Sequence, residues 1–170
     1  MSVNTRGTIG VSSSWNQVST DDNNSNNTIT DQGSLTYSKQ YTSGTSTGTV
    51  SQIFNKVGSL SSGGSGNFNL TGLQQSILGN TVIKSFSGVN SLTIQNRSTN
   101  PGYNISLNVF SSSGFRQPFG YTTGSIVIGP NSCVHVNTAG ADWPVNTNSR
   151  QILLVDGGSG ASYSMSIMGH

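Results

Sequence analysis

Residues 152–168 read ILLVDGGSGASYSMSIM and contain the clearest pattern in the chain. A short apolar run is followed by a glycine-rich segment, and glycine reaches positive φ without a steric penalty. Tyr163, Met165 and Ile167 then alternate with serines. Alternation with period two directs the apolar side chains to one face of a strand. The stretch therefore predicts a β-hairpin with one buried face.

An isolated hairpin is only marginally stable in water, so this one needs partner strands. Two further pairs of alternating apolar runs supply them, residues 92–94 with 105–109 and residues 126–128 with 134–136, each pair separated by a turn-forming segment. Consecutive hairpins are typical of an antiparallel sandwich or barrel. We expect the following residues to share one buried face: Leu92, Ile94, Ile105, Leu107, Tyr163, Met165 and Ile167.

Composition favours the same fold class. Ser, Gly, Asn and Thr make up more than half of the 170 residues, and Glu is absent. These four residues favour turns and strand surfaces over helix interiors. We therefore expect an all-β protein, an antiparallel β-sandwich, with a single domain over residues 31–170. The one helix expected is short and runs from Thr71, as N-cap, to Gly79, as C-terminal stop.

Residues 1–30 are polar and predict an extended N-terminal arm. Its large apolar residues are Ile9, Val11, Trp15 and Val18. A polar segment with a Trp is either a loose terminus or an arm ordered against another surface. We expect the second, an arm that reaches a neighbouring subunit or a capsid by adding a strand to an exposed sheet edge. Trp15 is the expected anchor and Val11 a further candidate interface residue.

Charge and targeting signals exclude several classes of partner. Seven Lys and Arg residues are spread singly along the chain, with a net charge of +2, so no basic patch for nucleic acid is predicted. No apolar run approaches the roughly 20 residues of a membrane span, and no signal peptide is indicated. Cys133 is the only cysteine, which excludes an intrachain disulfide. We expect a soluble chain made in a cytoplasm.

Residues with catalytic or metal-binding chemistry are few. Cys133 and His135 share one face of a predicted strand, but two ligands cannot close a zinc site. The five acidic residues are all Asp, with Asp156 in a turn and Asp142 in a loop, so no facing pair of carboxylates for glycoside hydrolysis is predicted. We expect no catalytic residue, no bound metal and no cofactor.

Aromatic residues in two loops are the candidate interface. Phe115, Arg116, Phe119 and Tyr121 lie in one predicted loop and Trp143 in the next. Aromatic residues and Arg are favoured anchors at protein interfaces. The alternative is that these side chains fold back and close the end of the sandwich.

Five segments between residues 66 and 170 share a pattern of turn glycines and strand residues: FNLTGL (68–73), LGNTVI (78–83), VNSLTIQN (89–96), GPNS (129–132) and SYSMSIMG (162–169). This pattern resembles small virion-associated proteins of tailed bacteriophages, which are often encoded near the major capsid protein. The resemblance implies a β-sandwich, for which a jelly roll is one candidate topology, that decorates or cements a capsid as an oligomer. It carries no catalytic residues. The usual Pro-Gly turn is replaced here by Gly129-Pro130-Asn131, which leaves the turn type open.

We therefore expect a non-enzymatic structural protein on the capsid exterior of a phage particle. Its expected partners are the major capsid protein and its own copies, as a dimer or trimer. The alternative is a carbohydrate- or receptor-binding β-sandwich of a phage tail or fibre, whose loop aromatics stack on sugar rings. An enzyme ranks third, because two His, five Asp and no Glu leave little acid–base machinery.

Overall fold

The computed structural model describes residues 5–21, 24–108, 113–120, 124–138 and 140–170, and for Trp15 and residues 17–21 and 24–31 it describes the backbone only. The regular secondary structure in these ranges consists of β-strands, with no helix, which confirms the predicted all-β class. No helix among the described residues could span a membrane. The chain divides into two units, residues Thr8–Gln40 and the remainder, and each is described by itself.

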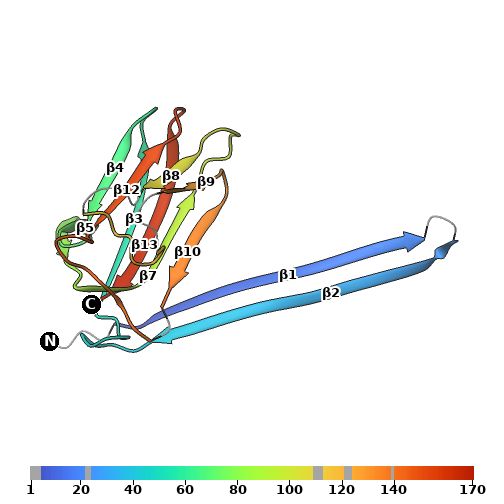
Figure 1. Ribbon diagram of the computed structural model, residues 1–170, viewed down its shortest axis with the longest axis horizontal. Coiled ribbons are helices and arrows are strands. Elements are labelled where there is room, and N and C mark those ends of the chain that lie inside the picture. Colours follow the sequence, from blue (N-terminus) through green and yellow to red (C-terminus); the bar gives the residue numbers. More distant parts are fainter. Residues whose placement is uncertain (1–4, 22–23, 109–112, 121–123, 139) are drawn as a thin grey trace. The chain divides into compact units, whose positions relative to one another are not determined.

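One layer of the larger unit is the sheet centred on β13, which we call the β13 sheet (Figure 1). β13 (Ala161–Gly169) lies between β7 (Gly88–Asn96) and β3 (Gln52–Leu60). β10 (Cys133–Asn137) and the two-residue β11 (Trp143–Pro144) also pair with β7. Every pairing is antiparallel, and β3 and β10 are the edge strands of the described sheet.

The second layer is the sheet centred on β12, which we call the β12 sheet. β12 (Gln151–Asp156) lies between β4 (Ser65–Asn69) and β8 (Ile105–Asn108), and β9 (Ser125–Ile128) pairs with the other side of β8. These pairings are antiparallel as well. The two sheets form the layers of a β-sandwich, as Figure 1 shows.

The strand order is that of a jelly roll. Numbered one to eight along the chain, the eight main strands follow the orders 1-8-3-6 in the β13 sheet and 2-7-4-5 in the β12 sheet. Eight antiparallel strands in two sheets joined by Greek-key connections define this topology. The expected antiparallel sandwich is therefore confirmed.

The core lies between the two sheets. All seven residues predicted to be buried are buried, which confirms that prediction. The expectation that they share one face of one sheet is wrong. Ile105 and Leu107 belong to β8, whereas the other five belong to β7 and β13 in the opposite sheet. The two sets face one another across a single hydrophobic cluster. Burial of apolar surface at about 25 cal/mol per Å² stabilises this layer packing.

The three hairpins predicted from the sequence are wrong in their pairing. β7 and β8, β9 and β10, and β12 and β13 are consecutive strands, yet the members of each pair lie in opposite sheets. The connections are arches that cross from one layer to the other. The reason is that period-two alternation records which face a strand buries and does not record which strand lies beside it.

A buried polar side chain holds the arch between β7 and β8. Asn96, the last residue of β7, donates hydrogen bonds from Nδ2 to the carbonyl oxygens of Tyr103 (2.6 Å) and Ile128 (3.0 Å). Its Oδ1 accepts one from the N–H of Ser98 (3.0 Å). Three satisfied hydrogen bonds allow a polar side chain to end an otherwise apolar strand inside the core.

The predicted helix from Thr71 to Gly79 is wrong. These residues lie mostly in a β-hairpin formed by β5 (Leu73–Ile77) and β6 (Asn80–Lys84). The two residues that join these strands have positive φ, 50° at Leu78 and 82° at Gly79. Positive φ at both central residues is the backbone of a type I′ turn, which matches the twist of a hairpin. The tight turn at Gly79 therefore joins two strands rather than ending a helix.

The smaller unit is a long two-stranded ribbon, drawn in blue in Figure 1. It consists of β1 (Gly7–Asp21) and β2 (Asn24–Tyr41), which pair with each other. An extended arm was expected over residues 1–30, with the sandwich domain starting at residue 31. That boundary falls inside β2, because the second strand returns along the first as far as Tyr41.

Candidate functional site

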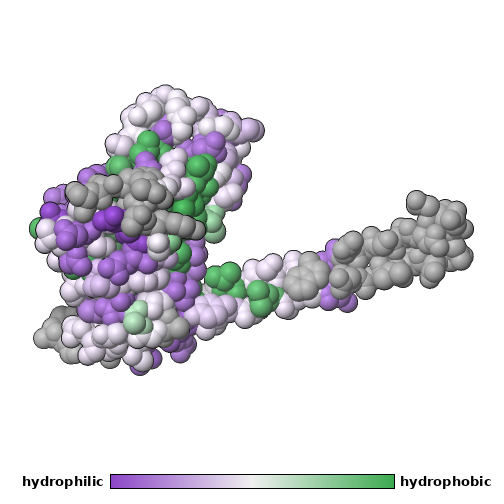
Figure 2. Space-filling view, in the orientation of Figure 1, coloured by the Kyte–Doolittle hydropathy of each residue, from purple (hydrophilic) through white to green (hydrophobic). Residues whose placement is uncertain are grey.

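The ribbon formed by β1 and β2 exposes several large apolar side chains to solvent. Val11, Leu35 and Tyr37 are 47%, 69% and 41% exposed. Figure 2 shows apolar patches, in green, on the coloured part of the ribbon. Trp15, the expected anchor, has a side chain outside the described residues. A two-stranded sheet with exposed apolar residues is marginal in water, so this surface is the first candidate for a binding site.

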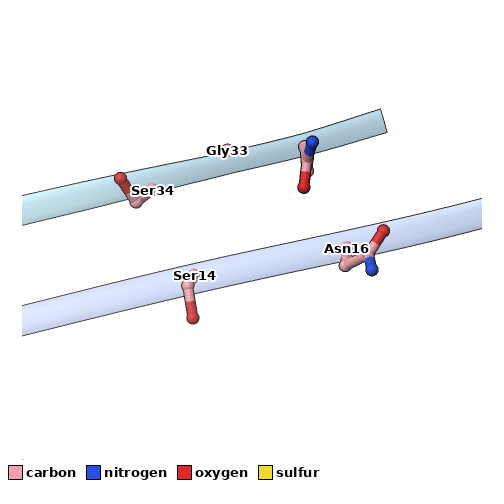
Figure 3. A pocket seen from close by; sticks show the side chains of 5 residues that line it. Ser14, Asn16, Gly33 and Ser34 are labelled. Carbon is pink, nitrogen blue, oxygen red and sulfur yellow. The ribbon is translucent and has the colours of Figure 1, made fainter. Parts of the chain in front are cut away.

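Further along the same ribbon, small polar residues border an open hollow. Ser14, Asn16, Gln32 and Ser34 are exposed and, with Gly33, border an open hollow of about 570 Å³. Figure 3 shows that the labelled side chains are short and lie along the two strands. Such a hollow has no walls that could enclose a small ligand. We interpret this part of the ribbon as a contact surface rather than a pocket.

The residues that flank the ribbon are fixed in the larger unit. The hydroxyl of Tyr41, which is 2% exposed, donates to the carbonyl oxygens of Thr138 (2.8 Å) and Asn90 (3.3 Å). Before the ribbon, the hydroxyl of Thr5 donates to the carbonyl oxygen of Ser51 (3.1 Å). The chain therefore leaves and re-enters the sandwich at anchored positions.

The loop aromatics pack into the sandwich. Phe115 is 1% exposed and makes an edge-to-face contact with the half-buried Trp143, with ring centroids 6.5 Å apart. Phe119 packs against the same core, Arg116 is half-buried, and Tyr121 lies outside the described residues. These aromatics close the sandwich, so Phe115 offers no surface to a partner.

Cys133 and His135 lie on the outward face of β10 and are not brought together with a third ligand. Cys133 is an exposed free thiol, and His135 Nδ1 lies 2.8 Å from Thr93 Oγ1. Burial lowers the pKa of His135, and a hydrogen bond with Asn137 offsets part of that shift. Within the described ranges no group of three His, Cys, Asp or Glu residues could hold a metal.

Asp156 ties two connections together. Its Oδ2 accepts hydrogen bonds from the backbone N–H groups of Gly63 (2.9 Å), Gly158 (2.8 Å) and Gly160 (2.9 Å). Burial raises the pKa of this carboxyl, but the backbone hydrogen bonds outweigh burial and hold the pKa below its usual value. Asp156 thus fixes the arch between β12 and β13 against the arch between β3 and β4.

Ser87, Asp142 and His170 form a hydrogen-bonded chain that the sequence analysis missed. Ser87 Oγ lies 3.0 Å from His170 Nδ1, and His170 Nε2 lies 2.9 Å from Asp142 Oδ2. Burial raises the pKa of Asp142, but hydrogen bonds within its own backbone and from His170 outweigh it and lower the pKa. Ser87 is 83 positions from His170 in the sequence, and Asp142 is 28 positions from it, so only the fold brings the three residues together.

The hydrogen bonds around Ser87, Asp142 and His170 link three segments of the sandwich. A serine hydrolase uses the same three residue types, with backbone N–H groups left open for the oxyanion. Here the N–H groups of Ser87 and Gly88 both donate to the carbonyl oxygen of His170, at 2.7 and 3.1 Å. A Cβ at Gly88 would collide with Asp142 Oδ2, so only glycine allows the approach. The group therefore joins the start of β7, the end of β13 and the segment before β11.

A groove opens between the edge strands β3 and β4. Its volume is about 280 Å³, and its apolar wall consists of Phe54, Phe68 and Leu73. Lys56 borders the groove together with side-chain amides of β4 and β5. Phe68 stacks edge-to-face on Tyr163, with ring centroids 5.8 Å apart. This groove is the second candidate site, and no motif in the sequence pointed to it.

Comparisons with known proteins find only distant structural similarity. No family model matches the chain, and neither does any curated protein sequence. Among solved structures the chain is similar to the crystal structure of the Yersinia pseudotuberculosis-derived mitogen, with 12% sequence identity and a TM-score of 0.35. The match covers 70% of this chain and 86% of that chain. A similarity this distant carries no argument about the fold or the function of this chain.

Proposed function

We propose that this protein is a non-enzymatic structural component of a phage particle. It binds the major capsid protein and its own copies, as a dimer or trimer, and decorates or cements the outside of the head after synthesis in the host cytoplasm. The observation that carries the proposal is the ribbon, which exposes Val11, Leu35 and Tyr37 along a sheet of only two strands.

The ribbon supports an assembly role on energetic grounds. Ordering the backbone costs about 1–2 kcal/mol per residue, whereas a hydrogen bond contributes only about 0.5–1.5 kcal/mol net. A sandwich offsets that cost by burying apolar surface, and the exposed ribbon does not. Docking on a protein surface would supply the missing burial, as in strand addition and other extended binding modes.

The jelly-roll topology supports the proposal more weakly. Jelly rolls occur in viral capsid proteins and also in lectins, and a fold does not by itself determine function. The sugar-binding alternative relied on loop aromatics, and Phe115 and Trp143 are used to pack the sandwich. A non-enzymatic role is supported by the chain of Ser87, His170 and Asp142, whose neighbouring N–H groups are already occupied.

The test replaces the ribbon and measures assembly. A variant in which a short Gly-Ser linker substitutes for residues 8–40 should retain the circular dichroism and cooperative unfolding of the sandwich. It should no longer self-associate in sedimentation experiments, and it should not bind shells assembled from the major capsid protein of the same phage. Full occupancy of shells by this variant would contradict the proposal.

A further inference from the structure

We propose that the groove between β3 and β4 is the docking site for the β1–β2 ribbon of a second copy of this chain, an inference that rests on the proposed function. It identifies the surface on which the ribbon acts. The ribbon supplies a net negative charge and exposed apolar residues, and the groove supplies an apolar wall and an exposed lysine.

The groove lies where the described sandwich has two unpaired edges. β3 pairs only with β13 and β4 only with β12, so the outer sides of both strands lack a partner among the described strands. Unpaired edges bind extended chains through main-chain hydrogen bonds, and side-chain pockets give the specificity. Phe54, Phe68 and Leu73 form such a pocket beside these edges.

Lys56 decides which kind of strand the groove accepts. Lys56 is the register partner of Met165, so it belongs to the same face of its edge strand as Phe54, but its own side chain is exposed at the rim of the groove. It has no ion-pair partner within the described part of the chain. A lysine on an edge strand disfavours pairing with apolar strands. The same charge favours a strand that brings a carboxylate.

The glycine next on this face keeps the pocket wall close to the edge. A Cβ at Gly58 would lie 2.7 Å from the hydroxyl oxygen of Tyr163, closer than packing allows. Tyr163 can therefore extend under β3 and contact Phe68. The lining of the groove thus combines aromatic side chains with the edge lysine Lys56.

The two units of the chain have opposite net charges. Residues 8–40 contain three aspartates, Asp21, Asp22 and Asp31, and one basic residue, Lys39, which gives a formal charge of −2. The remainder contains six basic and two acidic residues, a formal charge of +4. Complementary charge steers association and selects partners. The exposed Leu35 and Tyr37 of β2 match the apolar wall of the groove, so the ribbon of another copy fits this site in both respects.

The first experiment measures self-association of the full chain by sedimentation equilibrium. Lys56→Glu should weaken association about tenfold or more, because it sets an acidic ribbon against an acidic groove. Arg97→Glu makes the same charge change at an exposed position outside the groove and should leave the association constant within about twofold. If both variants weaken association equally, the change in net charge explains the loss, and the inference is overturned.

A second pair of variants keeps the inference testable if Lys56→Glu affects folding. Asn67→Trp fills the groove from an exposed position and should weaken association without changing charge. Replacing Asp21, Asp22 and Asp31 by Lys should weaken it as well, and combining this change with Lys56→Glu should restore it. Failure of the combined variant to regain association would contradict direct pairing of ribbon and groove.

The outcomes separate this inference from the proposed function. If the ribbon replacement abolishes association while Lys56→Glu and Asn67→Trp retain it in full, the ribbon docks elsewhere and only the groove assignment fails. If the wild-type chain is monomeric at about 100 μM, well above the Kd of most specific interfaces of standard size, self-assembly itself is contradicted.

Discussion

The sandwich and the ribbon are built from the same polar residue types, yet they differ in what they bury. The sandwich gathers apolar residues from both sheets into one cluster, in which Leu92, Ile94 and Leu107 are at most 1% exposed. The ribbon buries Ile9 and leaves Val11 and Leu35 in solvent. Hydrophobic burial stabilises the first region, whereas the second depends mainly on main-chain pairing. From this difference we expect the sandwich to be stable by itself, and the proposed partner surface would supply the burial that the ribbon lacks.

The largest effect should come from the core of the sandwich. Leu107→Ala should lower the free energy of unfolding by about 2–5 kcal/mol, because a fully buried leucine leaves a cavity when it is truncated. Val57→Ala, at a residue 63% exposed on β3, should change it by less than about 0.5 kcal/mol. Urea denaturation measures both. Similar losses for the two variants would show that the β13 and β12 sheets do not enclose one core.

The next effect concerns the carboxylate that joins two arches. Asp156→Asn should lower the free energy of unfolding by about 1.5–3 kcal/mol at neutral pH, because charge-assisted hydrogen bonds from three backbone N–H groups become weaker. The depressed pKa of Asp156 means that its contribution is present above the unfolded-state pKa and is lost as the pH falls through the folded-state pKa.

Denaturation at several pH values tests that sign. The wild-type chain should lose more stability than Asp156→Asn when the pH is lowered from about 6 to below about 4, the region of an ordinary Asp pKa. Parallel losses in the two proteins would assign the acid sensitivity to other carboxyls, of which Asp142 also has a lowered pKa.

A smaller effect, of opposite sign, is expected at the β5–β6 turn. Leu78 has a φ of 50° and is 97% exposed, so its side chain contributes no packing at a strained position. Leu78→Asn should raise the free energy of unfolding by about 1 kcal/mol, since Asn tolerates this conformation. Asn131→Leu, at a φ of 55°, should lower it by a similar amount. Thermal unfolding at low protein concentration distinguishes the two directions.

The smallest effect on stability should arise in the ribbon. Leu35→Ser should change the free energy of unfolding of the isolated chain by no more than about 0.5 kcal/mol, because the side chain is already 69% exposed. The same variant should weaken self-association. A loss of stability comparable to that of Leu107→Ala would show that the ribbon already packs within its own chain.

The strands and their buried faces were predictable because alternation is a local property. Tyr163, Met165 and Ile167 alternate with serines, and the structure buries all three. Pairing was not predictable, since a turn rich in Gly and Asn suits both a hairpin and an arch. The distinction depends on buried side chains such as Asn96 and Asp156, whose hydrogen bonds hold the arches. Their partners are recognisable only after the fold is known.

The candidate sites were predictable only in part. The apolar residues of the polar N-terminal segment pointed to an arm, and Val11 lies exposed on the ribbon. Leu35, Tyr37 and Tyr41 hinted at a strand, but its pairing with the first strand was not predicted, because alternation is imperfect in a ribbon without a core of its own. The groove escaped for a different reason: Lys56, Phe68 and Leu73 come from three strands, and none of them belongs to a local motif.

The position of β12 and β13 has a consequence for synthesis on the ribosome. Each lies at the centre of its sheet, and β3 and β4 have no other partner among the described strands. A nascent chain therefore carries β4 unpaired until β12 has emerged and β3 unpaired until β13 has emerged, and long-range β pairing is slow. During that interval few charges protect the chain from aggregation. The serines that alternate with apolar residues in β13 instead limit continuous apolar windows, and so help a late-closing sandwich to remain soluble until it can close.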